Sequence, residues 1–187
     1  MAQETIPGTV TPYISLDGSV FAIFNQMISA AGGLTLAQVC SITGLEGSTV
    51  QNWVKRGFVA NPVKKRYYKR QLARILIINA LRDCMQLEQT VLILKYLNGE
   101  VEDESDDRVS EPELFDCFCA ITKELTLEGG ISQGKIDTRV KAAVSNLKEL
   151  KADSSQRLYR ALKIMVYAFT AAQFKREAEL RFNQLEI

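Results

Sequence analysis

The feature that most restricts the fold of this 187-residue chain is a pair of short amphipathic helices separated by a glycine turn. The first helix is predicted over residues 35–43, with Thr35 as its cap, and Gly44 follows where a left-handed helix end needs a glycine. Ser48 is then predicted to cap a second helix over residues 49–56. The apolar positions that would lock the two helices together are Leu36, Val39, Cys40, Leu45, Val50 and Trp53. This spacing is the helix-turn-helix pattern.

The outward face of the second helix carries polar side chains that suit the major groove of DNA. Amides of Asn and Gln can pair with the edge of adenine, and Lys can reach guanine or phosphate. An ordinary solvent-facing polar helix is the alternative interpretation. The side chains concerned are Thr49, Gln51, Asn52 and Lys55.

The net charge of +1 conceals a strongly basic block directly after this helix. Residues 55–70 hold seven cations and no acid. A short basic turn beside a helix-turn-helix is typical of a wing that contacts the DNA backbone or minor groove, with an affinity that falls as salt rises. The candidate DNA-binding residues are therefore Thr49, Gln51, Asn52, Lys55, Arg56, Lys64, Lys65, Arg66 and Tyr67.

An acidic block follows about 30 residues later. Residues 100–116 contain nine acids and Arg108 as the one cation. Such a composition favours a solvated linker, which we predict over residues 100–111, between an N-terminal unit (1–99) and a C-terminal unit (112–187). Solubility and spacing are its simplest role; the alternative is that it imitates phosphate and shields the basic block.

The rest of the chain has helical periodicity, which predicts an all-α protein ending in a helical bundle. Apolar residues recur at helical spacing from residue 19 to 31, 69 to 85 and 87 to 98, and again in three C-terminal stretches that begin at Pro112, Ile136 and Asp153. The last of these reaches towards Leu185 and begins with an almost wholly apolar half. It packs within its own subunit or forms a homodimer contact with a second copy, and the bundle could instead sense a ligand.

The composition argues against most catalytic and metal chemistry. There is no His, and the four Cys are too few for a disulfide framework. Cys117 and Cys119 point about 200° apart on a helix, so they cannot face one ion, and Cys117 is predicted to be a core residue. We expect no enzyme activity, metal or cofactor. The first cation is Lys55 and no apolar run reaches the length of a membrane span, so we expect neither signal peptide nor membrane association, and a cytoplasmic location.

Two stretches resemble the MerR-type winged-helix superfamily. LTLAQVCSITGLEGSTVQNWVKRGFV resembles the first half of that domain, and RYYKRQLARILIINALRDCMQLEQTVLILKYL resembles its wing end and following helix pair. More narrowly, QNWVKRGFVANPVKKRY followed by LARILIINALRDCMQLEQTV resembles a bacterial family of MerR-like proteins classed as a domain of unknown function. The resemblance covers residues 35–99. It implies base or backbone contacts at Gln51 and Asn52 and phosphate contacts at Arg66 and Tyr67.

Two functions remain open at this point. The first is a DNA-binding transcriptional regulator whose partner is double-stranded DNA. The second is a protein-interaction module on the same scaffold, whose basic face binds an acidic protein or the chain's own acidic linker.

Overall fold

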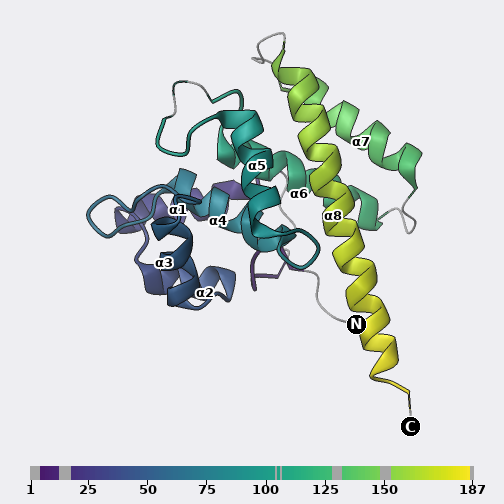
Figure 1. Cartoon of the computed structure of the whole chain (residues 1–187), viewed down its shortest axis with the longest axis horizontal. Coiled ribbons are helices and arrows are strands. Elements are labelled where there is room, and N and C mark those ends of the chain that lie inside the picture. The colour runs from purple at the N-terminus through teal and green to yellow at the C-terminus, as the bar shows by residue number, and fades with distance from the viewer. Residues whose placement is uncertain are drawn as a thin grey trace.

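The computed structural model describes residues 5–12, 18–103, 105, 107–127, 132–147 and 153–185. All the regular elements in this part of the chain are helices, as expected for an all-α protein, and they are joined by turns and three isolated β-bridges. Figure 1 shows a packed body from which one long helix projects. The helices are α1 (Phe21–Ala31), α2 (Leu36–Thr43), α3 (Gly47–Lys55), α4 (Lys69–Leu81), α5 (Leu87–Asn98), α6 (Glu111–Leu127), α7 (Gln133–Ser145) and α8 (Ser154–Phe182).

The predicted pair of short helices is present as α2 and α3. Thr35 caps α2 in a capping box with Gln38, and Gly44 ends it in the left-handed conformation at φ 71°. The cap predicted at Ser48 is wrong, because α3 begins two residues earlier, with Glu46 as its extended N-cap residue. The backbone N–H of Thr49 donates to the Glu46 carbonyl over 3.0 Å, so the helix is already formed at Ser48.

Helix α4 is the centre of the body and is buried on almost every side. It packs against α1, α2, α5, α6 and α8. The predicted continuation to Met85 is wrong: the helix ends at Leu81, and the backbone N–H groups of Cys84 and Met85 both turn back to the Leu81 carbonyl. The apolar residues that recur at helical spacing along it are buried, namely Leu72, Ile75, Leu76, Ile78 and Leu81.

The C-terminal helices form a layer against this centre. Helix α6 packs on α4, α7 and α8, and α8 runs along α5 and α7 before its last turns leave the body (Figure 1). On α6 the buried cysteine is Cys119, whereas Cys117, predicted as the core residue, is half-buried at the edge of the core. Gly129-Gly130, predicted to end the helix that begins at Pro112, and Leu150, predicted on the apolar stripe that begins at Ile136, fall outside the described residues.

The acidic segment does not behave as a solvated linker at its C-terminal end. Val109 is 5% exposed, and the Asn98 amide donates to its carbonyl over 2.8 Å. Glu111 is 1% exposed. Asp116, on α6, accepts hydrogen bonds from Ser19 and the Phe21 backbone and so caps α1 across the body. One continuous core joins the two predicted units, and the division between them at residues 100–111 stays a prediction.

Candidate nucleic-acid interface

Helix α3 presents the predicted polar face to solvent. Val50 and Trp53 are buried and fix the rotation of the helix. Gln51 and Asn52 are exposed as a result, and Lys55 is exposed one turn further on. Thr49 is half-buried, because it borders a depression of about 620 Å³ between α3 and the turn after α4. The residues that line this depression lie some 30 positions apart in the sequence. No local sequence pattern could therefore have predicted it.

The basic turn is a two-residue reversal with both lysines at its tip. Val63 and Arg66 exchange backbone hydrogen bonds of 3.0 and 2.9 Å. Lys64 and Lys65 both have positive φ, 49° and 62°, as in a type I′ hairpin turn. Their side chains are exposed and extend from the tip. The turn expected from the sequence is therefore formed. Its two sides are joined by an isolated β-bridge and do not extend into β-strands.

The turn is attached to the segment before α2. Leu34 and Tyr67 exchange two backbone hydrogen bonds of 2.8 Å. Gly33 lies alongside with φ 98°, and a Cβ there would come within 2.8 Å of the Arg66 Cβ, so a glycine is needed for this close approach. Arg66 Nη1 donates to the Gly33 carbonyl over 3.2 Å, and the Tyr68 hydroxyl donates to the Gly32 carbonyl over the same distance.

Tyr67 does not fit the phosphate-contacting role predicted for it. Its side chain belongs to the core and is 4% exposed, and this burial raises the pKa of its hydroxyl. The reason is its backbone pairing with Leu34, which turns the side chain inward. Tyr68, the next residue, is 37% exposed.

Arg56 is exposed but already engaged. Its Nη2 donates to Glu88 Oε1 on α5 over 2.6 Å, and its guanidinium lies 4.3 Å from the centre of the Phe58 ring. The backbone N–H of Glu88 and the Arg56 side chain hold the pKa of that carboxyl below its ordinary value. Much of the Arg56 charge is therefore neutralised within the chain.

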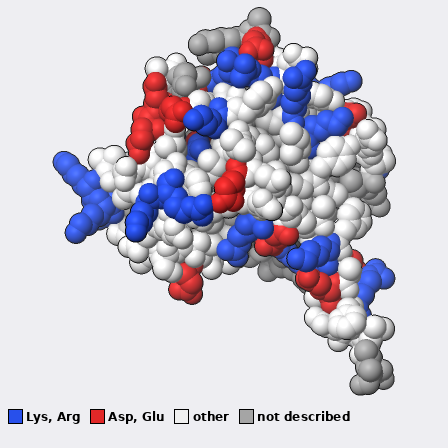
Figure 2. All heavy atoms as spheres, viewed as in Figure 1, with Lys and Arg blue, Asp and Glu red and all other residues white. Residues whose placement is uncertain are grey.

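The basic block thus divides into two groups. Arg56, Arg66 and Arg70 are bound to other parts of the chain. Lys55, Lys64, Lys65 and Lys69 are exposed, and among the described residues no ion pair involves them. Figure 2 shows Lys and Arg side chains gathered at the left-hand edge, where Figure 1 places the loop between α3 and α4.

The described part of the chain brings no three Cys, Asp or Glu side chains together as metal ligands. Cys117 has its pKa raised to about 11, first by burial and then by Asp116 and Glu113 nearby. None of the described helices has both the length and the apolar character required to cross a membrane.

Comparison with known proteins gives one family and one curated relative that can be named. No solved structure matches the chain. The chain is 33% identical over 79 residues to a Bacillus subtilis protein described as uncharacterized protein YkrK, a match that covers 40% of this chain and 34% of that protein. The chain therefore spans about a third of the length of this relative.

The family model that matches is described as a domain of unknown function, DUF1836, and it covers residues 18–118. This match includes α1 to α5, the acidic segment, the first turns of α6 and all nine candidate DNA-binding residues. It bears out the resemblance to a family of unknown function. Because the match covers more than half of its length, the chain belongs to the DUF1836 family.

Proposed function

We propose that this protein is a non-enzymatic, cytoplasmic DNA-binding transcriptional regulator with a MerR-like winged helix-turn-helix. Helix α3 would enter a groove with Gln51 and Asn52, and the basic turn would act as the wing. The observation that carries the proposal is that Lys55, Lys64 and Lys65 stay exposed and outside any ion pair of the described residues, while the neighbouring arginines are bound. Three such lysines are available for phosphate oxygens.

Helix α3 and the basic turn would have different roles, sequence recognition and phosphate binding. Asn and Gln amides at the exposed face of a helix can form paired hydrogen bonds with adenine, which gives sequence preference. Lysines at the tip of a turn contact phosphates, which gives affinity but no preference. Tyr67 has no part in this account, because its side chain lies in the core.

A selection of bound sequences from random DNA by the full chain tests this proposal. We expect enrichment of a defined sequence, lost in the double variant Asn52→Ala, Lys65→Ala. The matched control is Asn146→Ala, Lys141→Ala, which removes the same kinds of side chain from exposed positions on α7 and at its C-cap. Absence of any salt-sensitive DNA binding by the wild-type protein would contradict the proposal.

The second candidate function is a protein-interaction module whose basic face binds an acidic partner. It is favoured by the contacts that the chain makes with its own acids, such as Arg70 with Asp107 over 3.2 Å. Co-purification from cells distinguishes the two functions. A partner that stays bound after nuclease treatment and high salt favours this second function, whereas loss of the bound material on nuclease treatment favours DNA.

We further propose that two copies pair through α8. Its outward face carries apolar residues at alternating spacings of three and four, as in a coiled-coil seam. Ile164 is 48% exposed, Tyr167 37% and Phe174 61%, a pattern unusual for a monomer. Analytical ultracentrifugation tests the pairing: we expect a dimer for the wild type and a monomer for Phe174→Glu. The full set on this face is Ile164, Tyr167, Ala171, Phe174 and Ala178.

A further inference from the structure

We propose that the acidic segment, residues 100–111, positions the basic turn for binding and does not mask it, with Glu102 as the main positioning residue. This inference rests on the proposed DNA binding. The two roles of the segment predict opposite effects of removing its charges. A mask competes with DNA, so its loss strengthens binding, whereas a support orders the turn, so its loss weakens binding.

Glu102, Asp103 and Asp107 contact the chain on both sides of the basic turn, at Asn61 and Arg70. Glu102 Oε1 accepts two hydrogen bonds from Asn61, one from the backbone N–H and one from the side-chain amide, each 3.0 Å long. The carbonyl of Asp103 and the carboxylate of Asp107 both accept from Arg70 Nη2, over 3.0 and 3.2 Å. Glu111 pairs with Arg74 inside the core.

None of these contacts involves the lysines proposed to bind phosphate. Glu102 binds an amide, and the arginines that Asp107 and Glu111 bind are 13% and 4% exposed. These two arginines are therefore poorly placed to reach DNA. The acids leave Lys64 and Lys65 in solvent at the tip of the turn.

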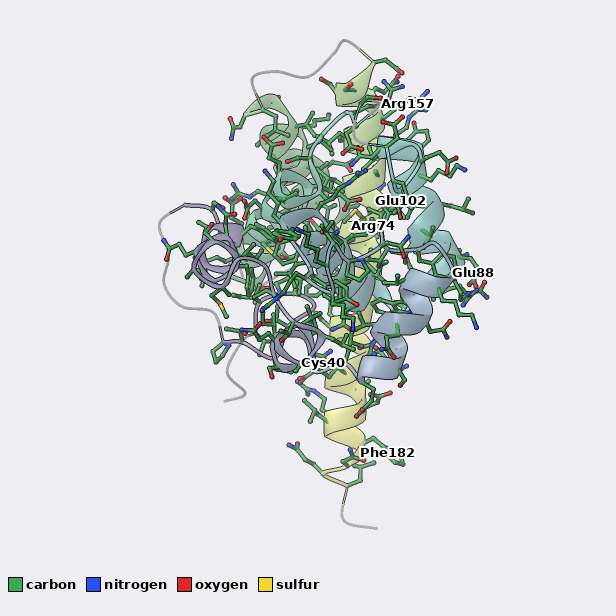
Figure 3. All side chains as sticks on the ribbon, turned by 90° about the vertical axis from the view of Figure 1, so that its left-hand side faces the viewer. Cys40, Arg74, Glu88, Glu102, Arg157 and Phe182 are labelled. Atoms are coloured by element: carbon green, nitrogen blue, oxygen red, sulfur yellow. The ribbon has the colours of Figure 1, made fainter. Side chains whose placement is uncertain are left out.

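The start of this loop, residues 58–61, is also held by α4. From the opposite side, Arg74 Nε donates to the Phe58 carbonyl over 2.6 Å and Gln71 Nε2 donates to the Asn61 carbonyl over 3.2 Å. Asn61 is thus bound by α4 through its carbonyl and by Glu102 through its N–H and amide. Figure 3 labels Glu102 of the acidic segment and Arg74 of α4.

The conformation of the turn explains why support is needed. Lys64 and Lys65 both adopt a left-handed conformation that L-residues other than Gly, Asn and Asp rarely adopt. A turn of this kind forms poorly by itself and is maintained by the contacts around it. The contacts at Asn61 fix the segment that leads into the turn. The two lysines are then ordered before DNA arrives, so the chain loses less conformational freedom on binding.

The segment also links the turn to the C-terminal helices. Glu111 is the first residue of α6, and α6 packs on both α7 and α8. A displacement of the start of α6 would therefore loosen the chain beside the basic turn.

Three single variants of the full chain test the inference. Glu102→Ala removes both hydrogen bonds to Asn61 and is expected to weaken DNA binding about fivefold. Glu102→Gln removes the charge but keeps an oxygen that accepts the same bonds, so binding should return to within about twofold of the wild type. Glu100→Ala is the matched control, because this exposed acid pairs with Lys95 and contacts no part of the turn. It should leave binding unchanged.

Amide hydrogen exchange in the protein without DNA gives the second measurement. The Arg66 N–H donates to the Val63 carbonyl, so its exchange reports whether the turn is closed. We expect faster exchange across residues 61–66 in Glu102→Ala only. Tighter DNA binding in both Glu102 variants and in Glu100→Ala would overturn the inference in favour of a mask, and unchanged exchange in Glu102→Ala would overturn it as well. The exchange measurement needs no DNA. It therefore tests whether Glu102 orders the basic turn even if the wild-type protein does not bind DNA and the proposed function is wrong.

Discussion

Arg74 and Glu111 form an ion pair inside the core, although 37 positions separate them in the sequence. Their side chains are 4% and 0% exposed. The same guanidinium donates to the Phe58 carbonyl, just after the candidate recognition helix α3. One buried charge therefore joins the exit of α3, the central helix α4 and the start of α6.

Breaking this pair from one side should strongly destabilise the protein. Glu111→Leu leaves the Arg74 charge buried without its carboxylate, and we expect a loss of about 3–5 kcal/mol in the free energy of unfolding. The double variant Arg74→Met, Glu111→Leu should recover most of that loss. Urea unfolding measures both. A single variant that costs less than about 1 kcal/mol would show that the pair is not shielded as described.

Substitutions at Tyr67 should affect stability and not DNA binding. Tyr67→Ala removes a ring from the core and is expected to cost about 3–5 kcal/mol. Tyr67→Phe keeps the ring and should bind DNA within about twofold of the wild type, because the hydroxyl of a 4% exposed side chain does not reach a phosphate. Thermal unfolding and fluorescence anisotropy test the two statements. A large loss of DNA affinity in a folded Tyr67→Phe protein would restore the phosphate-contacting role.

A glycine at the tip of the turn should have opposite effects on the stability of the fold and on DNA binding. Lys65 has φ 62°, so Lys65→Gly relieves strain and is expected to stabilise the fold by about 0.5–1 kcal/mol, the gain being reduced by the greater freedom of glycine when unfolded. The same change removes a cation and should weaken DNA binding. Chemical unfolding and binding titrations on one preparation check both effects. A less stable Lys65→Gly protein would mean that the turn is not left-handed at this position.

The Asp137–Lys163 pair should make stability depend on pH. Lys163 Nζ lies 2.7 Å from Asp137 Oδ1, and this hydrogen bond lowers the pKa of Asp137 and raises the pKa of Lys163. The contribution of Asp137 is present above its ordinary pKa of 3.8 and is lost as pH falls through the lowered value. The contribution of Lys163 is present below 10.5 and is lost as pH rises through the raised value.

Asp137→Asn should therefore melt below the wild type between about pH 5 and pH 9. The two melting temperatures should converge in strong acid, where Asp137 is protonated, and again in strong base, where Lys163 is neutral. Thermal melts across this range give the comparison. A constant difference at every pH would mean that the pair contributes through packing and not through its charges.

The cysteines should react with alkylating reagents in the order of their exposure and ionisation. Cys84 is exposed and should be modified first. Cys117 has a pKa of about 11, so about one thiol in a thousand is ionised at pH 8, and Cys119 is buried. Mass spectrometry of peptides after brief iodoacetamide treatment gives the order. Early modification of Cys117 would show that α6 is more open than described.

Local signals predicted the parts of the fold that depend on neighbouring residues. The capping box of Thr35 and Gln38 and the left-handed Gly44 set the ends of α2 through contacts within a few residues, so the sequence pattern is sufficient to locate them. The buried face of α3 follows from the spacing of Val50 and Trp53. At the start of α3 the two competing N-cap residues, Glu46 and Ser48, lie two positions apart, and propensity favoured the wrong one.

Long-range contacts decided what the sequence could not predict. The inward orientation of Tyr67 depends on backbone pairing with Leu34, 33 positions away. The burial of Arg74 requires a carboxylate that arrives from the acidic segment, which composition alone describes as solvated. Whether an ionisable side chain is buried thus depends on a distant partner, which the helical period does not reveal. The helical period alone did assign exposed side chains such as Gln51 and Asn52 to the correct face of α3.

The most direct test of the account is the salt dependence of DNA binding by the full chain. If Lys55, Lys64 and Lys65 each contact a phosphate, the logarithm of the association constant should fall against the logarithm of salt concentration with a slope near about −3. The variant Lys64→Gln, Lys65→Gln should reduce the magnitude of that slope by about 2, and the control Lys141→Gln should leave it unchanged. A wild-type protein that shows no salt-dependent binding, or a double variant with the wild-type slope, would contradict the proposal that the exposed lysines of the basic turn hold DNA.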